Sequence, residues 1–273
     1  MDIILLLKAL VMGIVEGLTE FLPVSSTGHL ILFGQLLRFQ GAFAQSFEVM
    51  IQLGAILAIV VFYREKLFGA LAHLGSGGWG RALLLRTLVG IAPAMVLGFL
   101  FHDSIKKLFS VEIVGVSLMV GALLLLAGET YVLKGKGSHQ PSKEDLSQLS
   151  FKDAFWIGLF QCLSLIPGMS RSGSTITGGL FRHLSPALAA EYSFFLAIPI
   201  MMGAFVLEAK DVVIGNASEA MALLVGFLVS FLVAYGVVRV FVAYLGKHSF
   251  RVFILYRLGV GILLLVLVYL RIV

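Results

Sequence analysis

Six separate stretches of this sequence stay apolar for about 20 residues, the length that an α-helix needs to cross the hydrocarbon core of a membrane. They lie at about 45–63, 82–101, 111–133, 186–208, 219–240 and 250–271. Only 13% of the 273 residues are charged and 59% are hydrophobic, whereas about a quarter of the residues in an average soluble domain are charged. The sequence predicts an all-α polytopic membrane protein and argues against a soluble enzyme, a disordered chain and a nucleic-acid-binding domain.

Two further apolar regions, 3–37 and 152–182, are too long for one span and are interrupted in the middle. The interruptions read EGLTEFLPVSSTGH (Glu16 to His29) and QCLSLIPGMSRSGST (Gln161 to Thr175). Irregular backbone at membrane depth is stable only where protein or a water-filled cavity satisfies its N–H and C=O groups. Each region is therefore predicted to be a re-entrant hairpin of two half-helices.

The two halves of the chain resemble each other weakly. Gly13 matches Gly158 at a spacing of 145 residues. Ser26 matches Ser170 at a spacing of 144. We therefore predict a single membrane domain, 1–273, with an inverted-topology repeat. Its parts are repeat one at about 1–133, a polar cytoplasmic linker at 134–150 and repeat two at about 150–273.

The lysines and arginines are distributed unevenly over the predicted loops. If 64–86 is cytoplasmic, twelve of the 20 lie inside, six lie outside and two lie at membrane depth. Because cytoplasmic loops carry the excess of Lys and Arg, this count predicts that both termini are outside. The two interrupted segments then enter from opposite faces and meet near the midplane of the bilayer, where inverted repeats with broken helices have their binding sites.

Glu16 and Glu20 in the first interruption are four residues apart and therefore share one face of a half-helix. Two neighbouring carboxylates in a medium of low dielectric constant remain ionised only with a cation beside them. A divalent cation with oxygen ligands, Mg²⁺ or Ca²⁺, meets this requirement, so the pair is a candidate metal site. The alternative is that one carboxyl group is protonated or paired with a basic side chain.

The second interruption surrounds Arg171 with small hydroxyl residues and glycines. A guanidinium group binds two oxygens at once, and a half-helix that begins near Ser172 would direct free N–H groups at a ligand. The pattern predicts an oxyanion site, with phosphate as the best candidate. The alternative is that the hydroxyls cap a broken helix while Arg171 neutralises a glutamate. The candidate substrate-binding residues of both interruptions are Ser25, Thr27, Gly168, Ser170, Arg171, Ser172, Gly173 and Thr175.

Ser26 and His29 lie three residues apart, close enough on a helical turn for a hydroxyl and an imidazole to act on one group. Such a pair alone is more often a helix cap and a hydrogen-bonded histidine. Beside two carboxylates and an arginine it becomes a candidate site of phosphoryl transfer. The spacing leaves open whether Ser26, His29 or a metal-bound water is the nucleophile.

The two motifs EGLTEFLPVSSTGH and PGMSRSGST (Pro167 to Thr175) together closely resemble the undecaprenyl-diphosphatase family, the bacitracin-resistance phosphatases of bacterial membranes. The resemblance implies hydrolysis of undecaprenyl diphosphate to undecaprenyl phosphate and inorganic phosphate. This reaction recycles the lipid carrier of peptidoglycan synthesis and confers resistance to bacitracin. The resemblance also implies a multi-pass protein of the plasma (inner) membrane, a divalent cation, and an active site that faces the periplasm or the cell exterior.

By position, the acidic residues of the family fall on Glu16 and Glu20, its proposed nucleophile on Ser26, its histidine on His29 and its motif arginine on Arg171. The resemblance leads us to expect that the carboxylates hold the metal, that Arg171 binds phosphate, that Ser26 attacks or aligns a water, and that His29 transfers the proton. The main alternative is an inverted-repeat transporter or flippase for a phosphorylated lipid or a small anion. The sequence also leaves a homodimer open.

Overall fold

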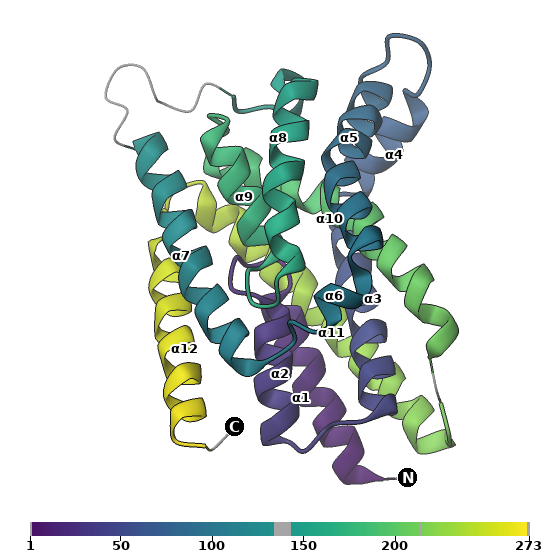
Figure 1. Ribbon diagram of the computed structural model, residues 1–273. Helices are drawn as coiled ribbons and strands as arrows, with labels where there is room; N and C mark the ends of the chain where they lie inside the picture. Colours follow the sequence, from purple (N-terminus) through teal and green to yellow (C-terminus); the bar gives the residue numbers. More distant parts are fainter. Residues whose placement is uncertain (1, 134–142, 213, 272–273) are drawn as a thin grey trace.

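The computed structural model describes residues 2–133, 143–212 and 214–271, and these residues form helices without any strand (Figure 1). The helices are α1 (Ile3–Thr19), α2 (Ser26–Leu36), α3 (Ala42–Phe62), α4 (Arg64–Ala72), α5 (Trp79–Leu100), α6 (His102–Lys106), α7 (Val111–Leu133), α8 (Phe151–Gln161), α9 (Arg171–Phe181), α10 (Pro186–Glu208), α11 (Ala217–Leu245) and α12 (Arg251–Tyr269). Short 3₁₀ turns lie at Leu146–Gln148, Cys162–Leu165 and Ala209–Asp211.

Within the described residues, six helices are long and apolar enough to cross a membrane, namely α3, α5, α7, α10, α11 and α12. Each coincides with one of the six apolar stretches of the sequence. The largest difference is at the end of α11, which continues past residue 240 to Leu245, because apolar residues continue up to Gly246. The prediction of an all-α polytopic membrane protein with six spans is confirmed.

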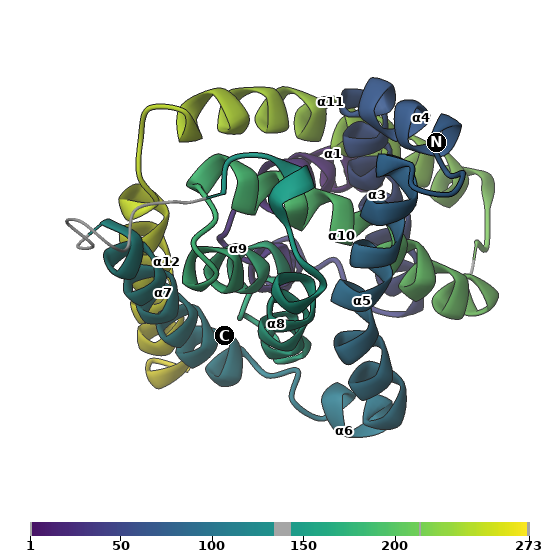
Figure 2. The same cartoon turned by 90° about the horizontal axis from the view of Figure 1, so that it is seen from above.

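The two interrupted segments each form two helices separated by a break. Figure 1 shows α1 and α2 in the lower half of the molecule and α8 and α9 in the upper half. The two helices of each segment pack against each other. Seen from above, α8 and α9 lie in the middle of the bundle, and α7 and α12 run side by side at its edge (Figure 2). That the two interrupted segments enter the membrane from opposite faces stays a prediction.

The second helix of each segment begins after a serine with an unusual backbone. Ser25 and Ser170 have positive φ values of 72° and 69°, a region that non-glycine residues rarely adopt. Each serine hydroxyl accepts a hydrogen bond from the N–H three residues later, on Gly28 and Gly173, which is a helix N-cap. The structure therefore pairs Ser170 with Ser25 at a spacing of 145, and the sequence match of Ser170 to Ser26 is off by one residue.

Glycines bring each interrupted segment close to a span of the other half of the chain. A Cβ atom at Gly13 in α1 would lie 2.7 Å from the carbonyl oxygen of Gly226 in α11. A Cβ atom at Gly158 in α8 would lie 2.4 Å from the carbonyl oxygen of Gly90 in α5. Small residues allow such close approach between membrane helices. The two contacts are what an inverted repeat would produce, although the repeat itself stays a prediction.

A buried carboxylate fixes the start of α8. The Asp153 carboxylate accepts hydrogen bonds from Lys143 Nζ at 2.7 Å, from Arg182 Nε at 2.9 Å, and from both the N–H and the hydroxyl of Ser150. Burial raises the pKa of Asp153, but the hydrogen bonds outweigh this effect and lower the pKa to about 2. These contacts attach the end of the predicted linker to α8 and α9, while residues 134–142 of that linker lie outside the described residues.

We expect Asp153→Asn to lower the melting temperature of the purified protein by several degrees at pH 7. The ionised carboxylate stabilises the fold above its ordinary pKa of 3.8, and this contribution disappears as the pH falls toward about 2. The difference in melting temperature between wild type and variant should therefore shrink between about pH 4 and pH 2. Glu144→Gln, at an exposed neighbouring carboxylate, serves as the control, and equal melting temperatures for the two variants would contradict the assignment.

Candidate active site

A cavity of about 170 Å³ lies where the two breaks meet. Its lining residues come from both interrupted segments and from three other parts of the chain. They are Glu20, Ser25, Ser26, Thr27, Gln52, Phe109, Ser164, Leu165, Pro167, Gly168, Ser170, Arg171 and Met201. The two motifs that the sequence singled out, 145 residues apart, therefore contribute to one site.

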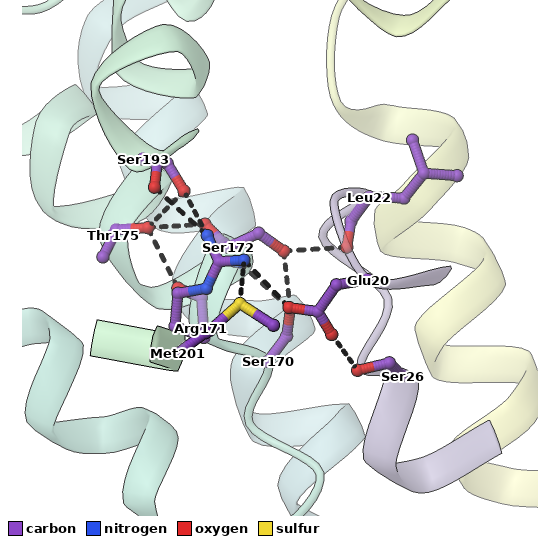
Figure 3. A network of polar contacts seen from close by, with 10 residues as sticks. Glu20, Leu22, Ser26, Ser170, Arg171, Ser172, Thr175, Ser193 and Met201 are labelled. Carbon is purple, nitrogen blue, oxygen red and sulfur yellow. Dashed lines mark hydrogen bonds and ion pairs between the residues drawn. The ribbon is translucent and has the colours of Figure 1, made fainter. Parts of the chain in front are cut away.

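Arg171 and Glu20 form an ion pair at this cavity (Figure 3). Arg171 Nη2 donates to Glu20 Oε1 at 2.9 Å, and Nη1 donates to the carbonyl oxygen of Ser193 at 3.1 Å. The two charged side chains are only 13% and 8% exposed. Among the described residues, the buried Arg171 Nε has no hydrogen-bond partner. The guanidinium group is thus held in place by Glu20 and Ser193, and its Nε is a buried donor.

The hydroxyl of Ser26 is hydrogen-bonded to the other oxygen of the same carboxylate. Ser26 Oγ donates to Glu20 Oε2 at 2.5 Å (Figure 3). A carboxylate in this position can accept the proton of a hydroxyl that acts as a nucleophile. Helical spacing could not reveal the contact, because Glu20 and Ser26 lie on opposite sides of the first break.

His29 does not line the cavity. Its Nδ1 lies 2.7 Å from the carbonyl oxygen of Ser25, and its Nε2 lies 2.7 Å from the hydroxyl of Tyr256. Because a carbonyl oxygen only accepts, Nδ1 carries the proton, and in the neutral ring Nε2 accepts from the tyrosine. Both nitrogens are therefore engaged away from the cavity, so the geometry gives no support to proton transfer by His29.

Three of the predicted substrate-binding residues lie behind the cavity and do not line it. Ser172 Oγ donates to the carbonyl oxygen of Leu22 at 2.8 Å and so connects the two breaks. Thr175 Oγ1 lies 2.7 Å from Ser193 Oγ. The Gly173 N–H is used in the cap described above. The first turn of α9 directs these residues toward the protein interior, where they are buried.

The first residues of α2 and α9, Ser26 and Arg171, both line the cavity. The N-terminus of a helix carries partial positive charge and N–H groups without an intrahelical partner. Two such ends directed at one cavity, together with Arg171, favour an anion there. Ser25, Thr27 and Ser170, which carry hydroxyl groups, also line this cavity.

Glu16 lies one helical turn before Glu20 and is fully buried at 0% exposure. Within the described residues, neither of its carboxylate oxygens has a hydrogen-bond partner. The carboxylates of Glu20 and Glu48 and the guanidinium group of Arg171 lie within electrostatic reach of it. The described part of the chain contains no group of three or more His, Cys, Asp and Glu side chains arranged for a metal. One or two carboxylates with water and phosphate ligands are nevertheless sufficient for Mg²⁺, so Glu16 and Glu20 fit a divalent cation, although Glu16 does not line the cavity.

Several polar residues of the membrane spans contribute to the site, although the sequence indicated no firm role for them. Gln52 of α3 lines the cavity, Ser193 of α10 binds Arg171, and Tyr256 of α12 binds His29. Polar groups inside apolar spans are costly to insert, and this cost is the signal that could have singled them out.

Comparison with known proteins gives the family. A family model described as bacitracin resistance protein BacA matches residues 9–263, which include both breaks and every residue of the cavity. The chain belongs to the BacA family. Among its BacA relatives, the undecaprenyl-diphosphatase of Caldanaerobacter subterraneus subsp. tengcongensis is 47% identical over 271 residues, 98% of each chain. The undecaprenyl-diphosphatases of a Thermoanaerobacter species and of Thermoanaerobacter pseudethanolicus are each 46% identical over 266 residues, 97% of each chain.

Proposed function

We propose that this BacA-family protein hydrolyses undecaprenyl diphosphate to undecaprenyl phosphate and inorganic phosphate. The observation that carries the proposal is the contact of Ser26, Glu20 and Arg171 at one cavity: a hydroxyl, a proton acceptor and a guanidinium in a single hydrogen-bonded chain. The names of relatives at 46–47% identity support the substrate. A transporter or flippase needs no hydroxyl–carboxylate pair, and none of the reported relatives supports it.

The diphosphate headgroup would bind with its terminal phosphate against Arg171 and the N-terminal turns of α2 and α9. Phosphate oxygens would compete with Glu20 for the guanidinium group, which lines the cavity. Donors that are already fixed before the reaction stabilise the charge on a transferring phosphoryl group without reorganisation. The isoprenyl tail can remain in lipid, and Phe109, Leu165 and Met201 form the apolar part of the cavity wall.

In the proposed reaction Ser26 Oγ attacks the terminal phosphorus, and its proton passes to Glu20 Oε2. The bond from this phosphorus to the bridging oxygen breaks, and undecaprenyl phosphate leaves. Glu20 passes that proton to an oxygen of the departing undecaprenyl phosphate and so becomes a carboxylate again. Water then attacks the phosphoserine, Glu20 accepts one proton from the water and donates it to Ser26 Oγ as the bond from this oxygen to phosphorus breaks, and inorganic phosphate is released. In this scheme His29 orients the backbone at Ser25.

A divalent cation, Mg²⁺ or Ca²⁺, forms part of the proposal. Glu16 and Glu20 would hold it, since Glu16 is buried with both oxygens unpartnered among the described residues. When bound, the cation neutralises negative charge on the diphosphate. Membership of the BacA family leads us to place the protein in the plasma (inner) membrane. The distribution of Lys and Arg favours a cavity that opens to the periplasm or the cell exterior.

Phosphate release from a polyprenyl diphosphate by the detergent-purified protein tests the function. We expect release that a chelator abolishes and that Mg²⁺ or Ca²⁺ restores. Ser26→Ala should reduce kcat by about 10³-fold or more if Ser26 is the nucleophile, while Ser147→Ala, at an exposed hydroxyl, should not. Absence of release by the wild type would reject the proposed function. Substantial turnover by Ser26→Ala would mean that water attacks directly.

A further inference from the structure

Arg257 in α12 is a fully buried guanidinium group at 0% exposure. Among the described residues no carboxylate forms an ion pair with it. Its hydrogen bonds all go to backbone carbonyl oxygens. These are Pro23 at 3.2 Å from Nη1, Leu118 at 3.2 Å from Nε, and Gly168 and Met169 at 3.3 Å and 2.9 Å from Nη2. A buried charge without a counter-ion is costly, so these four contacts require an explanation.

The carbonyl groups that Arg257 binds belong to both breaks. Pro23 lies two residues before Ser25 in the first break. Gly168 and Met169 immediately precede Ser170 in the second. The contact with Leu118 connects both breaks to α7. One side chain therefore sets the separation between the backbone that carries Ser26 and the backbone that carries Arg171.

Two glycines on different helices make room for this guanidinium group. A Cβ atom at Gly121 in α7 would lie 1.9 Å from Arg257 Nη2. A Cβ atom at Gly173 in α9 would lie 2.6 Å from Arg257 Nη1. The sequence places Gly173 among the candidate substrate-binding residues, and in the structure the absence of a side chain at Gly173 lets α9 approach Arg257.

We propose that Arg257 is a positioning residue for the hydrolysis, and this inference rests on the proposed function. It holds the two breaks at the separation at which Ser26 and Arg171 face the same phosphate. The planar guanidinium presents five N–H donors in a fixed arrangement, so it can bind carbonyl groups from three segments at once. A lysine ammonium has three donors on a flexible chain and cannot reproduce this arrangement.

The test compares kcat, KM and melting temperature of purified variants with polyprenyl diphosphate as the substrate. Arg257→Met and Arg257→Lys should reduce kcat by about 10²-fold and about 10-fold, with KM changed less than about threefold, because small displacements of reacting groups cost this much. Gly121→Ala, which displaces Arg257 without removing it, should also reduce kcat by about 10-fold. Arg251→Met, at an exposed arginine of the same helix, and Gly259→Ala, whose Cβ meets nothing within 4 Å, should match the wild type.

The outcomes separate this inference from the proposed function. If the wild type releases no phosphate, the proposed function fails. If the wild type is active and Arg257→Met and Gly121→Ala retain its kcat, Arg257 does not position the site. A loss of kcat that only follows the fraction of folded protein, or an equal rise in KM, would also overturn the inference. If Arg257→Met does not fold, Gly121→Ala and Arg257→Lys decide the question.

Discussion

Arg171→Ala is expected to reduce phosphate release by about 10³-fold or more. Arg171 is the only cationic side chain that lines the described cavity, and its position is fixed by Glu20 and Ser193. Its removal takes away the donor for the transferring phosphoryl group and leaves the Glu20 carboxylate without its ion-pair partner.

The measurement is steady-state phosphate release by purified protein at saturating cation. Arg171→Lys keeps the charge but loses the planar pair of donors, so we expect it to recover only a small part of the lost rate. Arg239→Ala, at an exposed arginine of α11, is the control and should behave as the wild type. Turnover of Arg171→Ala close to that of the wild type would refute the assignment.

Glu20→Gln is expected to reduce kcat by about 10³-fold or more, because the amide is similar in size but cannot accept the proton of Ser26. His29→Gln should lose far less, about 10-fold, because the histidine contacts the Ser25 carbonyl and not the cavity. Measuring kcat of both variants as a function of pH separates the two candidate proton acceptors, Glu20 and His29. A larger loss for His29→Gln than for Glu20→Gln would return the role of base to the histidine.

Glu16→Gln tests the cation separately, since Glu16 does not contact Ser26. We expect it to raise the concentration of Mg²⁺ or Ca²⁺ that gives half-maximal activity by about 10-fold or more, and to weaken cation binding measured by calorimetry without substrate. Unchanged titrations in both measurements would show that Glu16 is not a ligand.

Local sequence was sufficient for the spans, for the positions of the two breaks and for most of the cavity. A span is recognised by the hydropathy of about 20 consecutive residues, and a break is recognised by Pro, Gly and Ser within such a stretch. Both signals depend only on neighbours in the chain. Local sequence also marks Glu20, Ser26 and Arg171 as candidate site residues, because charged and hydroxyl groups at membrane depth are costly, and the structure brings all three to one cavity.

Local sequence could not predict which of these side chains contact one another. Helical spacing predicts that Ser26 and His29 act on the same group. In the structure the Ser26 hydroxyl contacts Glu20 across the break, and His29 contacts Tyr256 in α12. Ser172 and Thr175 are among the candidate substrate-binding residues of the sequence, and in the structure α9 buries both and neither lines the cavity.

The sequence by itself determined an all-α membrane protein of the BacA type with two broken segments that carry acid, hydroxyl and guanidinium groups. The tertiary structure alone decided that Glu20 joins Ser26 to Arg171 and that Arg257 binds both breaks. The physical reason is that the contacts of Arg171 and Arg257 join groups more than 80 residues apart in the chain, while the contact of Ser26 with Glu20 crosses the irregular backbone of the first break. No local periodicity describes such backbone, and its geometry is set by the groups that satisfy its carbonyl oxygens.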